Sequence, residues 1–156
     1  MGILEPALAL ARKHRTFLQM EPEFLATLAC VLLESGQREQ ARARAEEAVR
    51  LADKYGTKLF EARAHLTLSR VLLGMSDRSS AKRIESALAR AQALIEETGA
   101  VAYIPWVHEE RAGLARLLGS EEKREHELRE AHRLFTEMGA TRHAERLTKD
   151  LGVPKV

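Results

Sequence analysis

The segment AVRLADKYG at residues 48–56 has three counterparts in the chain. It aligns without gaps with ALALARKHR (7–15), AQALIEETG (91–99) and AHRLFTEMG (131–139). The opening alanines, at positions 7, 48, 91 and 131, are separated by 41, 43 and 40 residues. In each segment a leucine follows three positions after the alanine and another apolar residue comes next, which is the spacing of one face of an amphipathic helix. Three segments end at glycine, a usual helix terminator, so the first helix, which ends at Arg15, should end less sharply.

A second set of segments lies between these helices. TLACVLL (27–33), TLSRVLL (67–73) and GLARLLG (113–119) align residue for residue, and each leads into a turn. The chain therefore repeats a helical hairpin with a period of about 40 residues. Because one hairpin cannot bury its apolar face alone, neighbouring hairpins stack, and we expect a right-handed α-solenoid.

The pattern predicts an all-α fold of about eight helices in a single domain. Ser79-Ser80 and Ser120 are expected as helix N-caps, and residues 74–78 as the longest loop. The helices are expected at roughly 4–15, 22–35, 38–55, 58–74, 79–98, 103–118, 121–138 and 140–151. The repeats then cover residues 1–15 (partial), 22–56, 59–99 and 103–139, with a capping helix at 140–151.

The composition supports a helical fold and limits the function. Hydrophobic residues make up 45%, charged residues 31% and aromatic residues 4%, so the chain can bury a core. Its 25 basic and 23 acidic side chains are interspersed, and the absence of a long basic run argues against a nucleic-acid partner. No stretch approaches the roughly 20 apolar residues that span a bilayer, so no membrane partner is expected. The single cysteine, Cys30, lies in an apolar run and is expected to pack in the core of a cytoplasmic protein.

The sequence lacks the patterns that carry catalysis. No two of the six histidines have the i, i+4 spacing of a zinc helix, so we expect solvated or interhelical histidines. Phosphate-binding, dinucleotide-binding and serine-nucleophile glycine motifs are missing. Carboxylate pairs such as Glu109-Glu110 lie among Arg and Lys, and we interpret them as solvated faces with ion pairs. We therefore expect no enzymatic activity, no cofactor and no metal.

The first helix of each pair alternates leucine, a small residue and an aliphatic residue, and the second helices are rich in alanine. This pattern resembles the tetratricopeptide repeat (TPR). The positions that match the packing positions of that family are Leu25, Leu28, Ala29, Leu32, Ala41, Ala45 and Ala48. The repeats here are longer than the usual 34 residues or so, and the usual Trp and Tyr anchors and closing Pro are missing.

The C-terminal third carries a closer resemblance. PWVHEER (105–111), ELREAHRLF (127–135) and MGATRHAERL (138–147) are similar to the C-terminal end of large bacterial signalling proteins. In those proteins a class III adenylate or guanylate cyclase domain and an AAA-type ATPase domain precede a long TPR region. The resemblance implies that this chain is the C-terminal fragment of such a protein, and a start in the second helix of a pair fits that expectation. It implies a regulatory scaffold that binds a protein or peptide, or another domain of the parent chain.

The resemblance also implies that the first helix of each pair lines a concave groove. The slight excess of arginine there suits an extended acidic or C-terminal peptide, although plain solvated residues explain the pattern as well. Trp106 is either a core anchor between repeats or an aromatic hot spot for a partner. The candidate partner-binding residues are Glu23, Cys30, Arg63, Leu66, Arg70, Trp106, Glu109 and Arg116, with Ala26 and Ala112 at equivalent positions.

Two further expectations concern partners. An alternative function is the sensor arm of a bacterial transcription regulator of the maltose-regulator type, in which helical repeats bind a small inducer. An inducer pocket should be lined by aromatics, of which the chain has few.

The first helix carries a set of apolar residues that a preceding repeat would cover, namely Ile3, Leu4, Leu8, Leu10 and Ala11. We therefore expect a weak homodimer through this end or through an exposed convex face, whereas the last helix resembles a polar cap.

Overall fold

A computed structural model of the chain describes residues 2–14 and 17–152, and within these ranges it is all-helical. The described residues form eight α-helices and no strand. The helices are α1 (Leu4–His14), α2 (Glu21–Glu34), α3 (Arg38–Tyr55), α4 (Lys58–Gly74), α5 (Ala81–Thr98), α6 (Ile104–Leu118), α7 (Glu121–Glu137) and α8 (Thr141–Asp150). The predicted all-α class is confirmed, and the less sharp helix end predicted at Arg15 lies outside the described residues.

Helix boundaries follow from local chemistry. Pro22 and Pro105 stand in the first turns of α2 and α6, where a missing N–H leaves no hydrogen bond unmade. At the end of α3, Gly56 adopts φ 65°, in the left-handed region that glycine tolerates. The N–H of Thr57 then donates to the carbonyl of Ala52 at 3.1 Å, which satisfies one of the last carbonyls of the helix.

The predicted serines stand at the helix starts, but their side chains do not cap the helices. Ser80 and Ser120 occupy the N-cap positions of α5 and α7, but neither side chain makes a capping hydrogen bond. A 3₁₀ turn, Arg78–Ser80, precedes α5, and the carboxylate of Asp77 caps it by accepting the N–H of Ser79 at 2.9 Å. Two more 3₁₀ turns, Leu18–Met20 and Val101–Tyr103, lead into α2 and α6.

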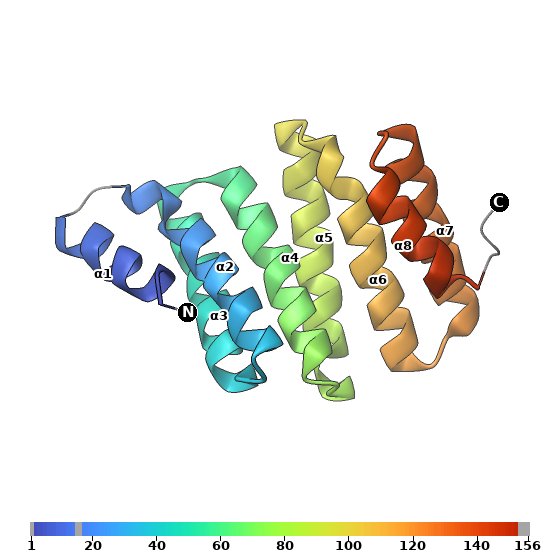
Figure 1. The fold of residues 1–156 in the computed structure, drawn as a ribbon, viewed down its shortest axis with the longest axis horizontal. Helices are drawn as coiled ribbons and strands as arrows, with labels where there is room; N and C mark the ends of the chain where they lie inside the picture. The colour runs from blue at the N-terminus through green and yellow to red at the C-terminus, as the bar shows by residue number, and fades with distance from the viewer. Residues whose placement is uncertain (1, 15–16, 153–156) are drawn as a thin grey trace.

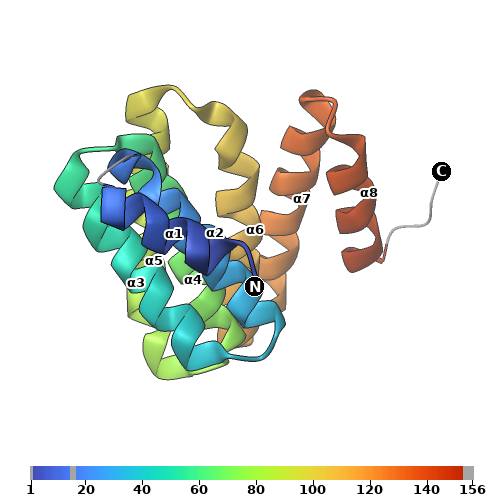
Figure 2. The same cartoon turned by 60° about the vertical axis from the view of Figure 1, so that its left-hand side comes forward.

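The helices are arranged in a row, with α1 and α8 at opposite ends (Figure 1). Consecutive helices pack against each other, and α2, α4 and α6, each the first helix of a pair, also lie side by side. Helices α3, α5 and α7 lie behind them in Figure 1, and the turned view in Figure 2 shows α7 and α8 standing apart from α1–α5. The three first helices therefore share one face of the molecule.

The core runs along the row between the two sets of helices. Its largest cluster joins α2 to α6 and includes Leu28, Leu72 and Leu94, all fully buried. The repeated alanines at the helix contacts have no exposed surface, which lets neighbouring helices approach closely; they are Ala41, Ala45, Ala48, Ala62, Ala91 and Ala131. Leu32 and Leu72 are 1% exposed, whereas their counterpart in the third repeat, Leu118, is 45% exposed.

Candidate functional site

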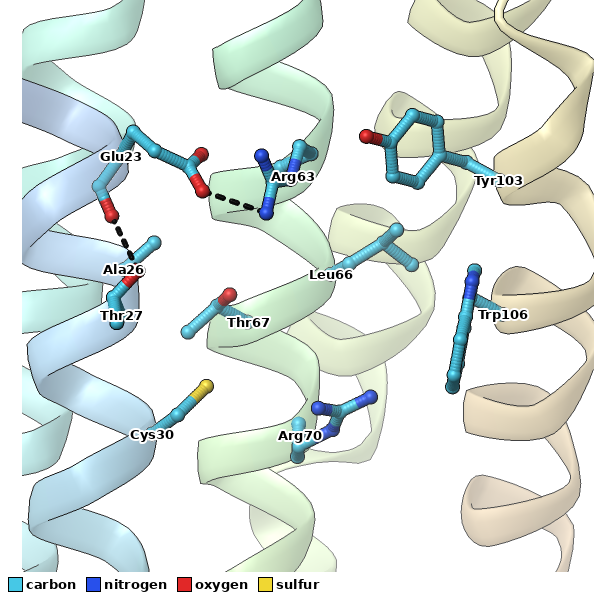
Figure 3. Close-up of a pocket in the computed structure, with 10 residues that line it drawn as sticks. All are labelled: Glu23, Ala26, Thr27, Cys30, Arg63, Leu66, Thr67, Arg70, Tyr103 and Trp106. Carbon is cyan, nitrogen blue, oxygen red and sulfur yellow. Dashed lines mark hydrogen bonds and ion pairs between the residues drawn. The ribbon is translucent and has the colours of Figure 1, made fainter. Parts of the chain in front are cut away.

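A hollow opens on the shared face of α2, α4 and α6 (Figure 3). It has a cavity volume of about 190 Å³. Four lining residues come from α2 and four from α4, and two come from the start of α6 and the turn before it. They are Glu23, Ala26, Thr27, Cys30, Arg63, Leu66, Thr67, Arg70, Tyr103 and Trp106.

Helical periodicity explains why these residues meet. On α2 the lining residues have the spacing i, i+3, i+4, i+7, which places them on one face of the helix. The four on α4 have the same spacing and stand forty positions later in the chain. The hollow is thus a product of the repeat: two successive first helices present the same face toward it.

Six of the eight predicted site residues line the hollow, and two do not. Glu23, Cys30, Arg63, Leu66, Arg70 and Trp106 lie together there. Glu109 instead forms an ion pair with Arg146 of α8, and Arg116 is exposed outside it. The hollow therefore lies mainly between the first two repeats, and these two positions of the third repeat stand outside it.

Three lining residues escaped the sequence interpretation. Thr27 and Thr67 follow one helical turn after Glu23 and Arg63, so the i, i+4 spacing would have identified them. Tyr103 lies in the 3₁₀ turn before α6, which the hydrophobic periodicity does not indicate.

One edge of the hollow is an ion pair backed by an aromatic ring. Arg63 Nη2 lies 2.6 Å from Glu23 Oε1, and the guanidinium carbon is 5.7 Å from the centre of the Tyr103 ring. The second oxygen of Glu23, Oε2, is buried and has no hydrogen-bond partner among residues 2–14 and 17–152. Burial raises the pKa of Glu23 and outweighs the opposite effect of Arg63.

A second ion pair stands at the other edge. Arg70 donates through Nε to Glu110 Oε1 at 2.8 Å. Glu110 is only 7% exposed, which corrects the expectation that the Glu109-Glu110 pair is solvated. Burial raises the pKa of Glu110, and the nearby Arg70 reduces the rise without cancelling it. Both arginines of the hollow are therefore neutralised by carboxylates of the neighbouring repeat.

Trp106 lies between the hollow and the C-terminal helices. Its ring makes edge contacts with Phe135, at 5.1 Å between centroids, and with His143, at 4.7 Å. The guanidinium of Arg146 lies 6.0 Å from its centre. Trp106 thus anchors α6 to α7 and α8, and another part of the residue lines the hollow.

Cys30 is partly exposed and lines the hollow, so the prediction that it packs in the core is wrong. Its neighbours in the hollow include Arg70 but no histidine. Across residues 2–14 and 17–152, no group of three His, Cys, Asp or Glu side chains could hold a metal ion. In the same ranges no helix is long and apolar enough to cross a membrane.

No protein-family model matches the chain, and no curated protein matches it significantly.

Proposed function

We propose that the chain is a right-handed TPR-like solenoid that binds an extended peptide, or a peptide-like segment of another domain, in the hollow between α2, α4 and α6. One observation carries the proposal: equivalent residues of successive repeats, forty positions apart, converge on one partly apolar hollow. A side-by-side array of first helices gives an elongated surface of the kind that solenoid proteins use for binding.

The biological setting in the proposal comes from the sequence resemblance. The module would act as a regulatory scaffold in a cytoplasmic bacterial signalling protein with cyclase and AAA-type ATPase domains. Its partner would be a separate protein or another domain of the parent chain. In this proposal the module acts through binding, without catalysis or a cofactor of its own.

The size of the hollow favours a peptide over the alternative, a small-molecule inducer. Pockets for drug-sized ligands measure about 300–1,000 Å³ and enclose most of the ligand. The hollow has a volume of about 190 Å³ and is partly open to solvent. It suits a single side chain of a longer partner better than a whole inducer.

A peptide-display selection tests the proposal. A library of random peptides is selected on the wild-type chain and on the Thr67→Trp variant, which fills the middle of the hollow (Figure 3). The matched control is Thr136→Trp, at an exposed position of α7 outside the hollow. The proposal requires peptides that bind the wild type and the control but not Thr67→Trp. Failure to enrich any such peptide contradicts it.

We also propose a weak homodimer through the N-terminal helix. Ile3 and Leu10 are 83% and 59% exposed, and Phe17, in the segment after α1, is exposed as well. Leu8, in contrast, is buried against α2 and α3. The apolar surface available for self-association is therefore smaller than the sequence pattern suggests.

A further inference from the structure

We infer that the hollow selects a peptide by one bulky apolar side chain and discriminates against acidic residues at that position. This inference rests on the proposed function and specifies the ligand of the same site. It replaces the acidic peptide that the arginine-rich sequence pattern suggests.

The positive charges of the hollow are already paired. Arg63 and Arg70 supply the positive charges that would attract an acidic peptide, but each already has a carboxylate partner, Glu23 at 2.6 Å and Glu110 at 2.8 Å. An incoming carboxylate would meet a neutralised pair and would be repelled by the carboxylate already present. The pairing therefore removes the electrostatic advantage of an acidic ligand.

The surface between the two ion pairs is largely apolar. Ala26 and Leu66 form its buried apolar part, and Cys30 and Trp106 flank them. Figure 3 shows Leu66 and Thr67 in the middle, with the Trp106 ring standing on the α6 side. A surface of this kind gains free energy by covering apolar area, so the side chain that enters should be aliphatic or aromatic.

The two arginines also offer N–H groups to a peptide backbone. Arg63 uses Nη2 and Arg70 uses Nε for their ion pairs, and both side chains remain partly exposed. Their other N–H groups are donors that suit backbone carbonyls. The two arginines stand seven residues apart on α4, about 10.5 Å along the helix axis. About three residues of an extended chain, at roughly 3.3 Å each, cover that distance.

The ligand of the hollow is then an extended peptide segment that lies along α4. Two of its carbonyls, about three residues apart, accept hydrogen bonds from Arg63 and Arg70. An apolar side chain between them enters the hollow beside Trp106. Specificity comes from that side chain, because the carbonyl contacts are the same for any sequence.

The test uses peptides selected on the wild-type chain and then synthesised with a fluorophore. Binding is measured by anisotropy for each selected peptide and for versions with the apolar anchor changed to Ala or Asp. We expect the Ala version to bind about tenfold more weakly, or worse, and the Asp version to bind at least as weakly. The Glu23→Gln variant frees the charge of Arg63, so it should reduce the penalty of the Asp version.

Other results of the selection and the binding measurements separate the inference from the proposed function. If the selection enriches acidic peptides or free C-terminal carboxylates that still fail on Thr67→Trp, the inference is overturned and the proposed function stands. If the Asp version binds the wild type more tightly than the apolar parent, the inference is overturned in the same way. If no peptide prefers the wild type over Thr67→Trp, both are overturned. Thr27→Trp, at an exposed position on the rim, repeats the blocking test if Thr67→Trp fails to fold.

Discussion

Arg70 on α4 and Glu110 on α6 form an ion pair across two neighbouring repeats, with 2.8 Å between Nε and Oε1 and forty residues between them in the chain. The pair is asymmetric: the Arg70 side chain is 46% exposed, whereas Glu110 is buried. Glu23 and Arg63 are also forty residues apart and link α2 to α4 in the same way. Each of these ion pairs thus links one first helix to the next first helix along the chain.

The asymmetry predicts a pH dependence for the Glu110→Gln variant. Burial raises the pKa of Glu110 in the folded state above its ordinary value of 4.5. The folded state therefore holds this proton more tightly than the unfolded state does, and the contribution of Glu110 to the free energy of unfolding falls as the pH rises above about 4.5. Glutamine stays neutral and lacks this fall. Urea unfolding at pH 4 and pH 7 should show Glu110→Gln gaining stability relative to wild type at the higher pH; a relative loss there contradicts the argument.

Replacing Arg70, the partner of Glu110, should lower the free energy of unfolding. Arg70→Met leaves the buried Glu110 carboxylate without its cation. Removing one partner of a buried ion pair is destabilising because the remaining charge is uncompensated. We expect a loss of about 1–3 kcal/mol in the free energy of unfolding at pH 7, the range being reduced because Arg70 is half-exposed. Arg129→Met, at an exposed i, i+4 pair with Glu125 on α7, is the control and should cost less than about 0.5 kcal/mol. Equal losses would show that Glu110 does not need Arg70.

A charge in the core should unfold the module. Leu28 is 1% exposed inside the largest core cluster, so Leu28→Asp buries a carboxylate among apolar side chains. Leu10→Asp makes the same chemical change at a position that is 59% exposed. Thermal unfolding followed by circular dichroism should show no folded baseline for Leu28→Asp and a near wild-type transition for Leu10→Asp. A cooperative, near wild-type transition for Leu28→Asp would place the core elsewhere.

Gly113 marks a close approach of α4 and α6. A Cβ atom built there would lie 2.9 Å from Cδ1 of Leu73. The end of a leucine side chain can rotate away from a single methyl group, and alanine favours a helix by about 1 kcal/mol over glycine, so Gly113→Ala should be close to neutral. Gly113→Leu cannot be accommodated in this way and should cost about 1–3 kcal/mol in chemical unfolding. If Gly113→Leu leaves the free energy of unfolding unchanged, the two helices do not pack at this point.

The homodimer prediction can be tested at two exposed apolar residues, Ile3 directly before α1 and Leu10 within it. Sedimentation velocity over a concentration series should show weak self-association of the wild-type chain. Ile3→Glu with Leu10→Glu places charges on exposed positions and should give a monomer without loss of stability. Leu8→Glu is not suitable, because Leu8 is buried and its replacement would undock α1. A wild-type monomer at every concentration, or a dimer that the double variant leaves intact, excludes this contact.

The sequence predicted the helices well because the same pattern occurs several times. Ala48, Ala91 and Ala131 recur at the same point of each repeat and are all fully buried, so the alignment identified the core face as well as the helix ends. The 3₁₀ turns were missed, since three residues are too few for a hydrophobic period. The exposure of Leu118 does not follow from its alignment with the buried Leu32 and Leu72, because alignment gives a position along a helix, whereas exposure depends on what packs beside it.

The candidate site was predicted where two equivalent helices face each other and missed where the third repeat differs. Glu23, Arg63 and Arg70 follow from the superposition of α2 on α4. Glu109, the equivalent position of the third repeat, does not line the hollow and instead forms an ion pair with Arg146 on α8. Arg63 and Arg70 are neutralised by carboxylates forty residues away, and counting the charges along one helix does not reveal such partners.

The reactivity of Cys30 tests most directly whether the hollow binds a partner. Cys30 is the single cysteine of the chain and lines the hollow, so the rate of its reaction with a disulfide reagent such as DTNB reports on occupancy. The control is Thr136→Cys in a Cys30→Ser background, which moves the thiol to an exposed position on α7. With the tightest selected peptide, the account predicts a saturable slowing at Cys30 and no change at position 136. A peptide that binds by calorimetry but leaves the Cys30 rate unchanged would contradict it.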